Sequence, residues 1–205
     1  MSIDAGLSAM IAHVDVQIPF PIGTVWDLLT DLPRMANLSP EVESARWLTD
    51  ESCVQGARFL ARNRRGPLQW QVTGEVTAAR PPIHFSWVVG HPSHPSSTWT
   101  YELQADHGST RVSQRFQHGP GMSWIRRMIG SNPAAATILI EQRRQMLESD
   151  MRVTLQRASS LLGDTAFPVR LVGPIRLVED AGPDRDPVAS RGCGRGRSAK
   201  QTRGT

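Results

Sequence analysis

The chain has 205 residues, of which 39% are hydrophobic and 20% are charged. This composition supplies enough apolar side chains for a core and excludes a wholly disordered polypeptide. The net charge of +4 does not indicate a uniformly basic nucleic-acid-binding domain, because most of the surplus lies near the C-terminus. Residues 1–163 hold 15 arginines against 14 acidic residues, whereas residues 164–205 hold eight basic and five acidic residues.

The chain shows no sequence signal of secretion or membrane insertion. Residues 1–12 lack the basic and apolar regions of a signal peptide, and the longest apolar run, residues 134–140, is far shorter than a membrane span. Cys53 and Cys193 indicate neither a disulfide framework nor a zinc-ligand spacing. We therefore expect a cytoplasmic protein without a transmembrane segment, as a monomer or homodimer.

The first forty residues predict one strand and two short helices. Residues 13–20 alternate between apolar and polar side chains, which is typical of a half-buried strand. Pro21 stands where a helix can begin, and residues 31–33 are expected to end it. A second short helix is expected over residues 34–38.

Residues 42–118 predict an antiparallel meander, because short extended runs follow one another with turn residues and no helices between them. The six candidate strands are 42–49, 56–65, 67–79, 83–90, 97–106 and 109–118. The stretch from 90 to 96, which is rich in proline and serine, is expected to be a loop.

After residue 121 the apolar period becomes helical. Residues 124–129 predict one or two helical turns. Asn132 and Pro133 are typical of an N-cap and a first helical residue, so a long helix is expected over residues 133–162. Gly163 is expected to end this helix.

Residues 164–205 form a Pro/Gly/Arg-rich tail that we expect to be disordered, which leaves residues 1–163 as the folded domain. The apolar fragment 167–178 is consistent with an extra strand, a docked arm or neither. The basic stretch 191–203 fits a solvated tail or a weak tether to nucleic acid or an anionic membrane. No specific nucleic-acid partner is expected.

Several short sequence motifs accompany this order of elements. They are Val25-Trp26-Asp27-Leu28, Ser39-Pro40-Glu41-Val42, Gly56-Ala57-Arg58-Phe59, Asn63-Arg64-Arg65-Gly66, Trp99-x-Tyr101-Glu102-Leu103 and Thr110-Arg111-Val112. Together they resemble the START/Bet v 1-like (SRPBCC) superfamily, specifically its polyketide cyclase/dehydrase-type proteins, over residues 12–162. One departure is the short second helix, where relatives usually carry a tryptophan and this chain has Met35-Ala36-Asn37-Leu38.

The resemblance implies an α+β helix-grip fold. In this fold a seven-stranded antiparallel sheet curls around a long C-terminal helix, and two short helices follow the first strand. A hydrophobic cavity lies between the sheet and the helix. The resemblance does not imply one activity, because fold alone is a weak guide to chemistry.

Alternation along the strands predicts which side chains face such a cavity. Arg58, Arg62 and Arg64 share one face of their strand, which should be exposed, so Asn63 points inward. The predicted ligand-binding residues are Phe59, Trp70, Phe85, Trp87, Trp99, Gln114, Leu147 and Met151. A mostly apolar, aromatic concavity with a few polar groups is typical of a small-molecule pocket. The alternative for each aromatic residue is ordinary core packing against the helix.

Tyr101, Asn63 and Arg144 are the candidate catalytic residues. Tyr101 can donate a proton or polarise a carbonyl, and Asn63 can orient one. Arg144 shares the phase of the apolar stripe of the long helix, where a guanidinium needs a carboxylate partner, a route to solvent or an anionic ligand. On the strands we expect no inward histidine and no inward pair of carboxylates.

These features favour a protein that binds a hydrophobic or aromatic small molecule, lipid- or polyketide-like, in an internal cavity. The first alternative is a polyketide cyclase/aromatase that catalyses aldol-type ring closure. The second is a toxin-like interaction protein of a toxin–antitoxin pair. No cofactor and no metal are expected, because His91 and His94 lie in a turn without nearby cysteine or acidic ligands.

Overall fold

The computed structural model describes residues 3–166, so the expected tail beyond residue 166, with the fragment 167–178, lies outside the described residues. The helices are α1 (Ile3–Ser8), α2 (Ile22–Leu29), α3 (Leu32–Ala36), α4 (Trp124–Ser131), the 3-10 turn η1 (Pro133–Ala135) and α5 (Ala136–Ala166). The strands are β1 (Ile11–Ile18), β2 (Val42–Trp47), β3 (Arg58–Arg65), β4 (Leu68–Arg80), β5 (His84–His91), β6 (His94–Asp106) and β7 (Ser109–His118).

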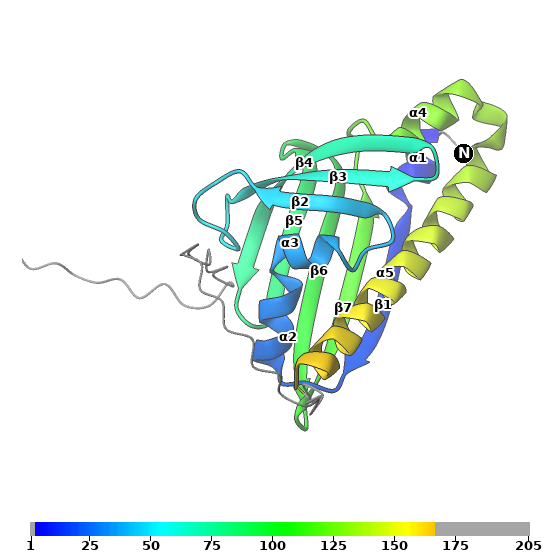
Figure 1. Ribbon diagram of the computed structural model, residues 1–205. Coiled ribbons are helices and arrows are strands. Elements are labelled where there is room, and N and C mark those ends of the chain that lie inside the picture. Colours follow the sequence, from blue (N-terminus) through cyan, green and yellow to red (C-terminus); the bar gives the residue numbers. More distant parts are fainter. Residues whose placement is uncertain (1–2, 167–205) are drawn as a thin grey trace, which may run out of the picture.

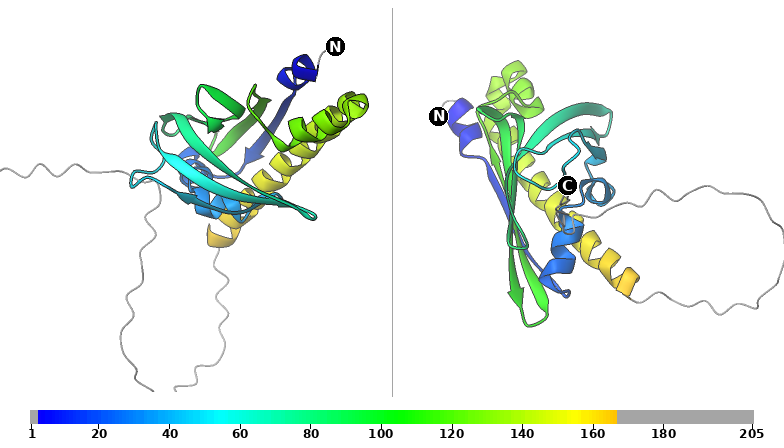
Figure 2. Two further views of the ribbon diagram at one scale, coloured as in Figure 1. Left: turned by 90° about the horizontal axis from the view of Figure 1, so that it is seen from above. Right: turned by 90° about the vertical axis from the view of Figure 1, so that its left-hand side faces the viewer.

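The seven strands form one antiparallel sheet in the order β1-β7-β6-β5-β4-β3-β2, which confirms the predicted helix-grip fold. In Figure 1 helix α5 crosses the sheet obliquely beside β1, and β2, β3 and β4 bend over at the other edge. Figure 2 shows the same arrangement from two further sides, with α1 and α4 at one end of the sheet and α2 toward the other. The core lies between the concave face and α5, where Val76, Val112 and Leu155 are fully buried.

The alternation of apolar residues positions the strands as predicted, but the N-terminal boundaries differ. Strand β1 begins at Ile11, and the sequence patterns do not predict helix α1. Asp31 is the N-cap of α3, because its side chain accepts a hydrogen bond from the backbone N–H of Arg34 at 3.2 Å. Pro33 lies in the first turn of α3, where backbone N–H groups have no acceptor within the helix. The N–H that proline lacks therefore costs the helix no hydrogen bond.

Two later boundaries also differ from the prediction: the stretch from 90 to 96 and the end of the long helix. The stretch from 90 to 96 is not a loop, because β5 and β6 continue to His91 and His94, which pair across a two-residue turn. Gly163 does not end the long helix, since α5 continues to Ala166. Gly163 is not among the described residues with positive φ, and glycine costs a helix only about 1 kcal/mol relative to alanine.

Within residues 3–166, no helix has both the length and the hydropathy needed to cross a membrane.

Candidate functional site

A cavity of about 370 Å³ lies between the concave face of the sheet and helix α5. Side chains from strands β2 to β7 and from α3, α4 and α5 line it. Ten of the eleven site residues named from the sequence are in the lining: Phe59, Asn63, Trp70, Phe85, Trp87, Trp99, Tyr101, Gln114, Leu147 and Met151. The volume lies within the range of small-molecule sites.

An aromatic wall is the most extensive feature of this cavity. Trp87 on β5 and Trp99 on β6 are direct cross-strand partners, and their rings are 5.9 Å apart at the centroids and within 2° of parallel. Tyr101 lies 5.4 Å from Trp87, and Phe116 meets Trp99 edge-on at 4.8 Å, again between ring centroids. Because side chains two residues apart share a sheet face, neighbouring strands build this wall from local alternation alone.

Two polar side chains interrupt the apolar part of the wall. Tyr101 on β6 and Gln114 on β7 are cross-strand partners, and both are buried. Burial raises the pKa of Tyr101 above its ordinary value, so its hydroxyl is a neutral donor. Gln114 Oε1 is buried without a hydrogen-bond partner in the described part of the chain. This amide oxygen is itself closed off from the open space of the cavity, so its lack of a partner is a cost of folding and not a free binding position.

His118 was missed by the sequence reasoning, although alternation places it on the same face of β7 as Gln114 and Phe116. It is 3% exposed and lines the cavity, which makes the expectation of no inward histidine wrong. Its Nε2 lies 2.9 Å from Ser123 Oγ, and its Nδ1 has no hydrogen-bond partner within residues 3–166. Burial, aided by the charge of Arg126, lowers the pKa of His118 to about 4, so the ring is neutral near pH 7.

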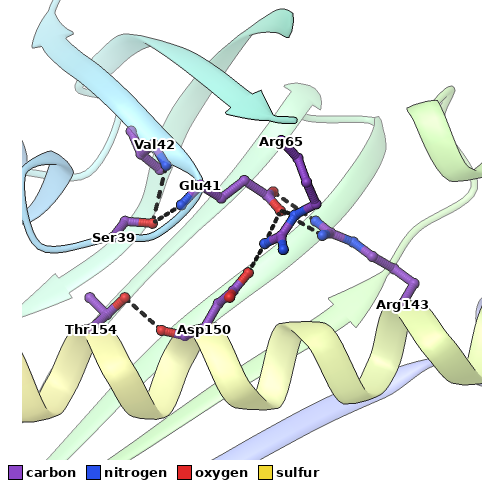
Figure 3. A network of polar contacts seen from close by, with 7 residues as sticks. All are labelled: Ser39, Glu41, Val42, Arg65, Arg143, Asp150 and Thr154. Carbon is purple, nitrogen blue, oxygen red and sulfur yellow. Dashed lines mark hydrogen bonds and ion pairs between the residues drawn. The ribbon is translucent and has the colours of Figure 1, made fainter. Parts of the chain in front are cut away.

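Four charged side chains connect the β2–β3 edge of the sheet to α5 (Figure 3). Arg143 donates from Nη1 and Nη2 to Oε2 and Oε1 of Glu41, at 2.6 and 2.8 Å. Arg65 donates from Nε to Glu41 Oε2 at 3.0 Å and pairs with Asp150. Glu41, Arg143 and Asp150 line the cavity. We call these four residues the ionic cluster.

The ionic cluster is balanced in charge and strongly coupled. Burial alone would raise the pKa of Glu41, but the hydrogen bonds and charges of Arg143 and Arg65 outweigh it and hold that pKa below its ordinary value. Burial raises the pKa of Asp150, against the attraction of Arg65. Arg143 also lies over the ring of Trp124, with its guanidinium carbon 4.9 Å from the centroid. Two guanidinium groups and two carboxyl groups thus satisfy one another at the wall of the cavity.

Arg144, the remaining predicted catalytic residue, lies outside the cavity lining. It pairs with Glu141 and Glu148 on its own helix, each at 2.6 Å. Four buried residues of α5 follow one another in steps of four: Arg143, Leu147, Met151 and Leu155. Each such step turns the buried stripe by about 40° around the helix axis. An ideal straight stripe drawn back from Leu162 therefore gives Arg144 the same orientation around the helix axis. The structure places Arg143, not Arg144, in the cavity wall.

A sheet that grips one long helix around an internal cavity defines the helix-grip class of cavity proteins. The chain belongs to the family described as polyketide cyclase/dehydrase and lipid transport, whose family model matches residues 11–149. This confirms the resemblance found in the sequence. A search of the curated proteins gave no match.

Solved structures of other proteins share the fold, among them the following three. The polyketide cyclase-like protein Cgl2372 from Corynebacterium glutamicum is 24% identical with a TM-score of 0.58, over 80% of this chain and 98% of its own. The Zhui aromatase/cyclase from Streptomyces sp. R1128 is 14% identical with a TM-score of 0.60, over 78% and 98%. The protein TTHA0849 from Thermus thermophilus is 12% identical with a TM-score of 0.59, over 77% and 99%. At these identities the likeness shows the fold alone.

Proposed function

We propose that the protein binds a hydrophobic or aromatic small molecule, lipid- or polyketide-like, in the cavity between the sheet and α5. The observation that carries this proposal is the aromatic wall around Trp87 and Trp99, which faces an open volume instead of closing on the helix. Burying apolar ligand surface against such a wall contributes roughly 25 cal/mol per Å². A flat ligand also gains stacking contacts with the indole rings.

Ala61 and Leu60 offer a matched test of this proposal. Ala61 is buried in the cavity lining, whereas its neighbour Leu60 lies on the opposite face of β3. Ala61→Phe fills the cavity, and Leu60→Phe adds a ring elsewhere on the same strand. N-phenyl-1-naphthylamine, a neutral dye that fluoresces in apolar sites, serves as the probe.

Wild-type protein is expected to bind this dye saturably at one site, and Ala61→Phe to weaken binding at least about tenfold. Leu60→Phe should leave the affinity unchanged, and thermal melts establish that both variants fold. Equal binding by Ala61→Phe and wild type would contradict the proposal, as would the absence of saturable binding by wild type. Native mass spectrometry of the purified full chain then identifies any co-purified ligand by its mass.

Catalysis of an aldol-type ring closure is the second candidate function, and the position of Tyr101 favours it. Ring closure joins an enol carbon to a carbonyl carbon, and the enol proton ends on the new hydroxyl oxygen, so no co-reactant is consumed. The buried Tyr101 hydroxyl can donate a hydrogen bond to the carbonyl oxygen as charge develops there. Turnover of a poly-β-ketone by wild type and not by Tyr101→Phe would support this function. Arg144→Ala serves as the control that should retain turnover.

A further inference from the structure

Asn63 is a polar side chain in an otherwise apolar part of the cavity. It is 7% exposed, points inward from β3 and lines the open volume. Its cross-strand partners are Val42 on β2 and Trp70 on β4, and Ala61 precedes it on the same face of β3. Within residues 3–166 no group makes a hydrogen bond to the Asn63 amide. A buried amide without partners is rare enough in proteins to need an explanation.

The Asn63 amide can be reached from the open space of the cavity. Within residues 3–166, the buried side-chain atoms that lack a hydrogen-bond partner and are closed off from water are Gln114 Oε1 and His118 Nδ1. Asn63 lacks a partner but is not among these residues, so its Oδ1 and Nδ2 keep contact with the open volume. One acceptor and one donor group, held side by side, are therefore available to a ligand.

The ionic cluster does not supply the missing partners. Arg65, two residues further along the same face of β3, donates to Glu41 and pairs with Asp150. Arg143 likewise gives both of its terminal nitrogens to Glu41. Because these charges satisfy one another, both polar groups of the Asn63 amide remain for a ligand.

We propose that Asn63 determines specificity by selecting flat, neutral ligands that carry a hydrogen-bond donor beside an acceptor. This inference rests on the proposed ligand-binding function and narrows the class of ligand. The edge of a lactam presents an N–H to Oδ1 and a carbonyl oxygen to Nδ2, and asparagine amides recognise paired groups of this kind in a bidentate manner. A carboxylate brings only acceptors, so it leaves Oδ1 unpaired and binds more weakly.

Trp70 offers the same ligand an aromatic surface beside the amide. It is the direct cross-strand partner of Asn63, which places their Cβ atoms about 5 Å apart. The Trp70 ring lies 6.0 Å from the Trp124 ring on α4, between centroids, and both residues line the cavity. A flat ligand that packs against the Trp70 indole therefore has its polar edge within reach of Asn63.

Two isomers test the inference by displacement of N-phenyl-1-naphthylamine from the full-length protein. 3-Methyl-2-quinolinone keeps the N–H beside its carbonyl group, whereas 1-methyl-2-quinolinone carries its methyl group on that nitrogen. We expect wild type to bind the 3-methyl isomer about tenfold more tightly than the 1-methyl isomer. 2-Naphthoate, a flat anion of similar size, should bind more weakly than the 3-methyl isomer.

A pair of variants assigns this preference to Asn63. Asn63→Leu, similar in volume but without the amide, should reduce the affinity ratio of the two isomers to within about twofold. The control, Gln69→Leu, removes an exposed amide from the opposite face of β4 and should keep the ratio. Thermal melts establish that both variants fold, and the comparison of the isomers in wild type needs no variant.

Equal affinities of wild type for the two isomers would overturn the inference and leave the proposed function standing. A ratio that persists in Asn63→Leu would also overturn it, as would tighter binding of 2-naphthoate than of 3-methyl-2-quinolinone. Failure of the dye itself to bind would instead count against the proposed function.

Discussion

Arg143 on α5 and Glu41, the residue just before β2, form a bidentate ion pair that joins the helix to the far edge of the sheet. Both hydrogen bonds are short, at 2.6 and 2.8 Å, and the two side chains are 8% and 14% exposed. Charge-assisted bidentate pairs of this kind combine strength with fixed geometry. The pair therefore fixes the distance between the curled sheet edge and α5.

Removing Arg143 should destabilise the fold far more than removing its neighbour Arg144. Arg143→Met leaves a buried carboxylate with only Arg65 as partner, so we expect a loss of about 2–4 kcal/mol in the free energy of unfolding. Arg144→Met removes two partly exposed pairs within one helix and should cost less than about 1 kcal/mol. Urea denaturation of both variants measures the difference. Equal losses would contradict the assignment of Arg143 to the cavity wall.

Gly74 should resist substitution because of Phe59, its direct cross-strand partner on β3. A Cβ at residue 74 would overlap Cζ of the Phe59 ring, which is buried. Gly74→Ala should therefore cost about 1–3 kcal/mol by overpacking, and Phe59→Leu in the same chain should recover part of this loss. Gly163→Ala is the control: nothing lies within 4 Å of its Cβ, and alanine should stabilise α5 by up to about 1 kcal/mol. A neutral Gly74→Ala would show that the ring has room to move.

His118 should make the protein less stable as pH falls from 6.5 toward 4. Its pKa is about 4 in the folded protein against 6.5 for a free histidine, so between these values the unfolded chain binds more protons. Each unit of this difference corresponds to about 1.4 kcal/mol, which gives a total loss of about 3 kcal/mol by pH 4. Above pH 6.5 His118 should have no effect.

The measurement is the free energy of unfolding at pH 7 and pH 5 for wild type and His118→Asn. In wild type the free energy of unfolding should fall between pH 7 and pH 5. Most of this fall should be absent in His118→Asn, since Asn does not titrate. His107→Asn, in the exposed β6–β7 turn, is the control and should behave as wild type. Because wild type and His118→Asn differ only at residue 118, the comparison also separates His118 from Glu41 and Asp150. Identical pH dependence in wild type and His118→Asn would contradict the prediction.

Asp31 should contribute to stability through α3, which carries Met35 and Ala36 to the cavity wall. Asp31→Ala removes the side-chain acceptor for the backbone N–H of Arg34 and should cost about 1 kcal/mol. Asp31→Asn retains a capping oxygen, so it should cost a few tenths of a kcal/mol at most. Thermal denaturation of the two variants distinguishes a capping role from a purely electrostatic one, in which both substitutions would cost the same.

The sequence by itself determined the sheet and the aromatic wall. Side chains on a strand alternate with a period of two, so Phe59 and Asn63 are inward and Arg62 outward whatever the rest of the chain does. The same rule, carried to the last residue of β7, would have found His118. These predictions succeed because the orientation of each side chain depends on its immediate neighbours.

Only the tertiary structure decided which arginine faces the cavity and which carboxylate meets it. Glu41 and Arg143 are 102 positions apart, and no local pattern connects them. The buried stripe of α5 rotates as the helix crosses the sheet obliquely, so a single helical phase selects Arg144 in place of Arg143. The curvature of the sheet, which brings the β2–β3 edge back toward α5, is a property of all seven strands together. For that reason the composition of the ionic cluster appears only when the whole fold is assembled.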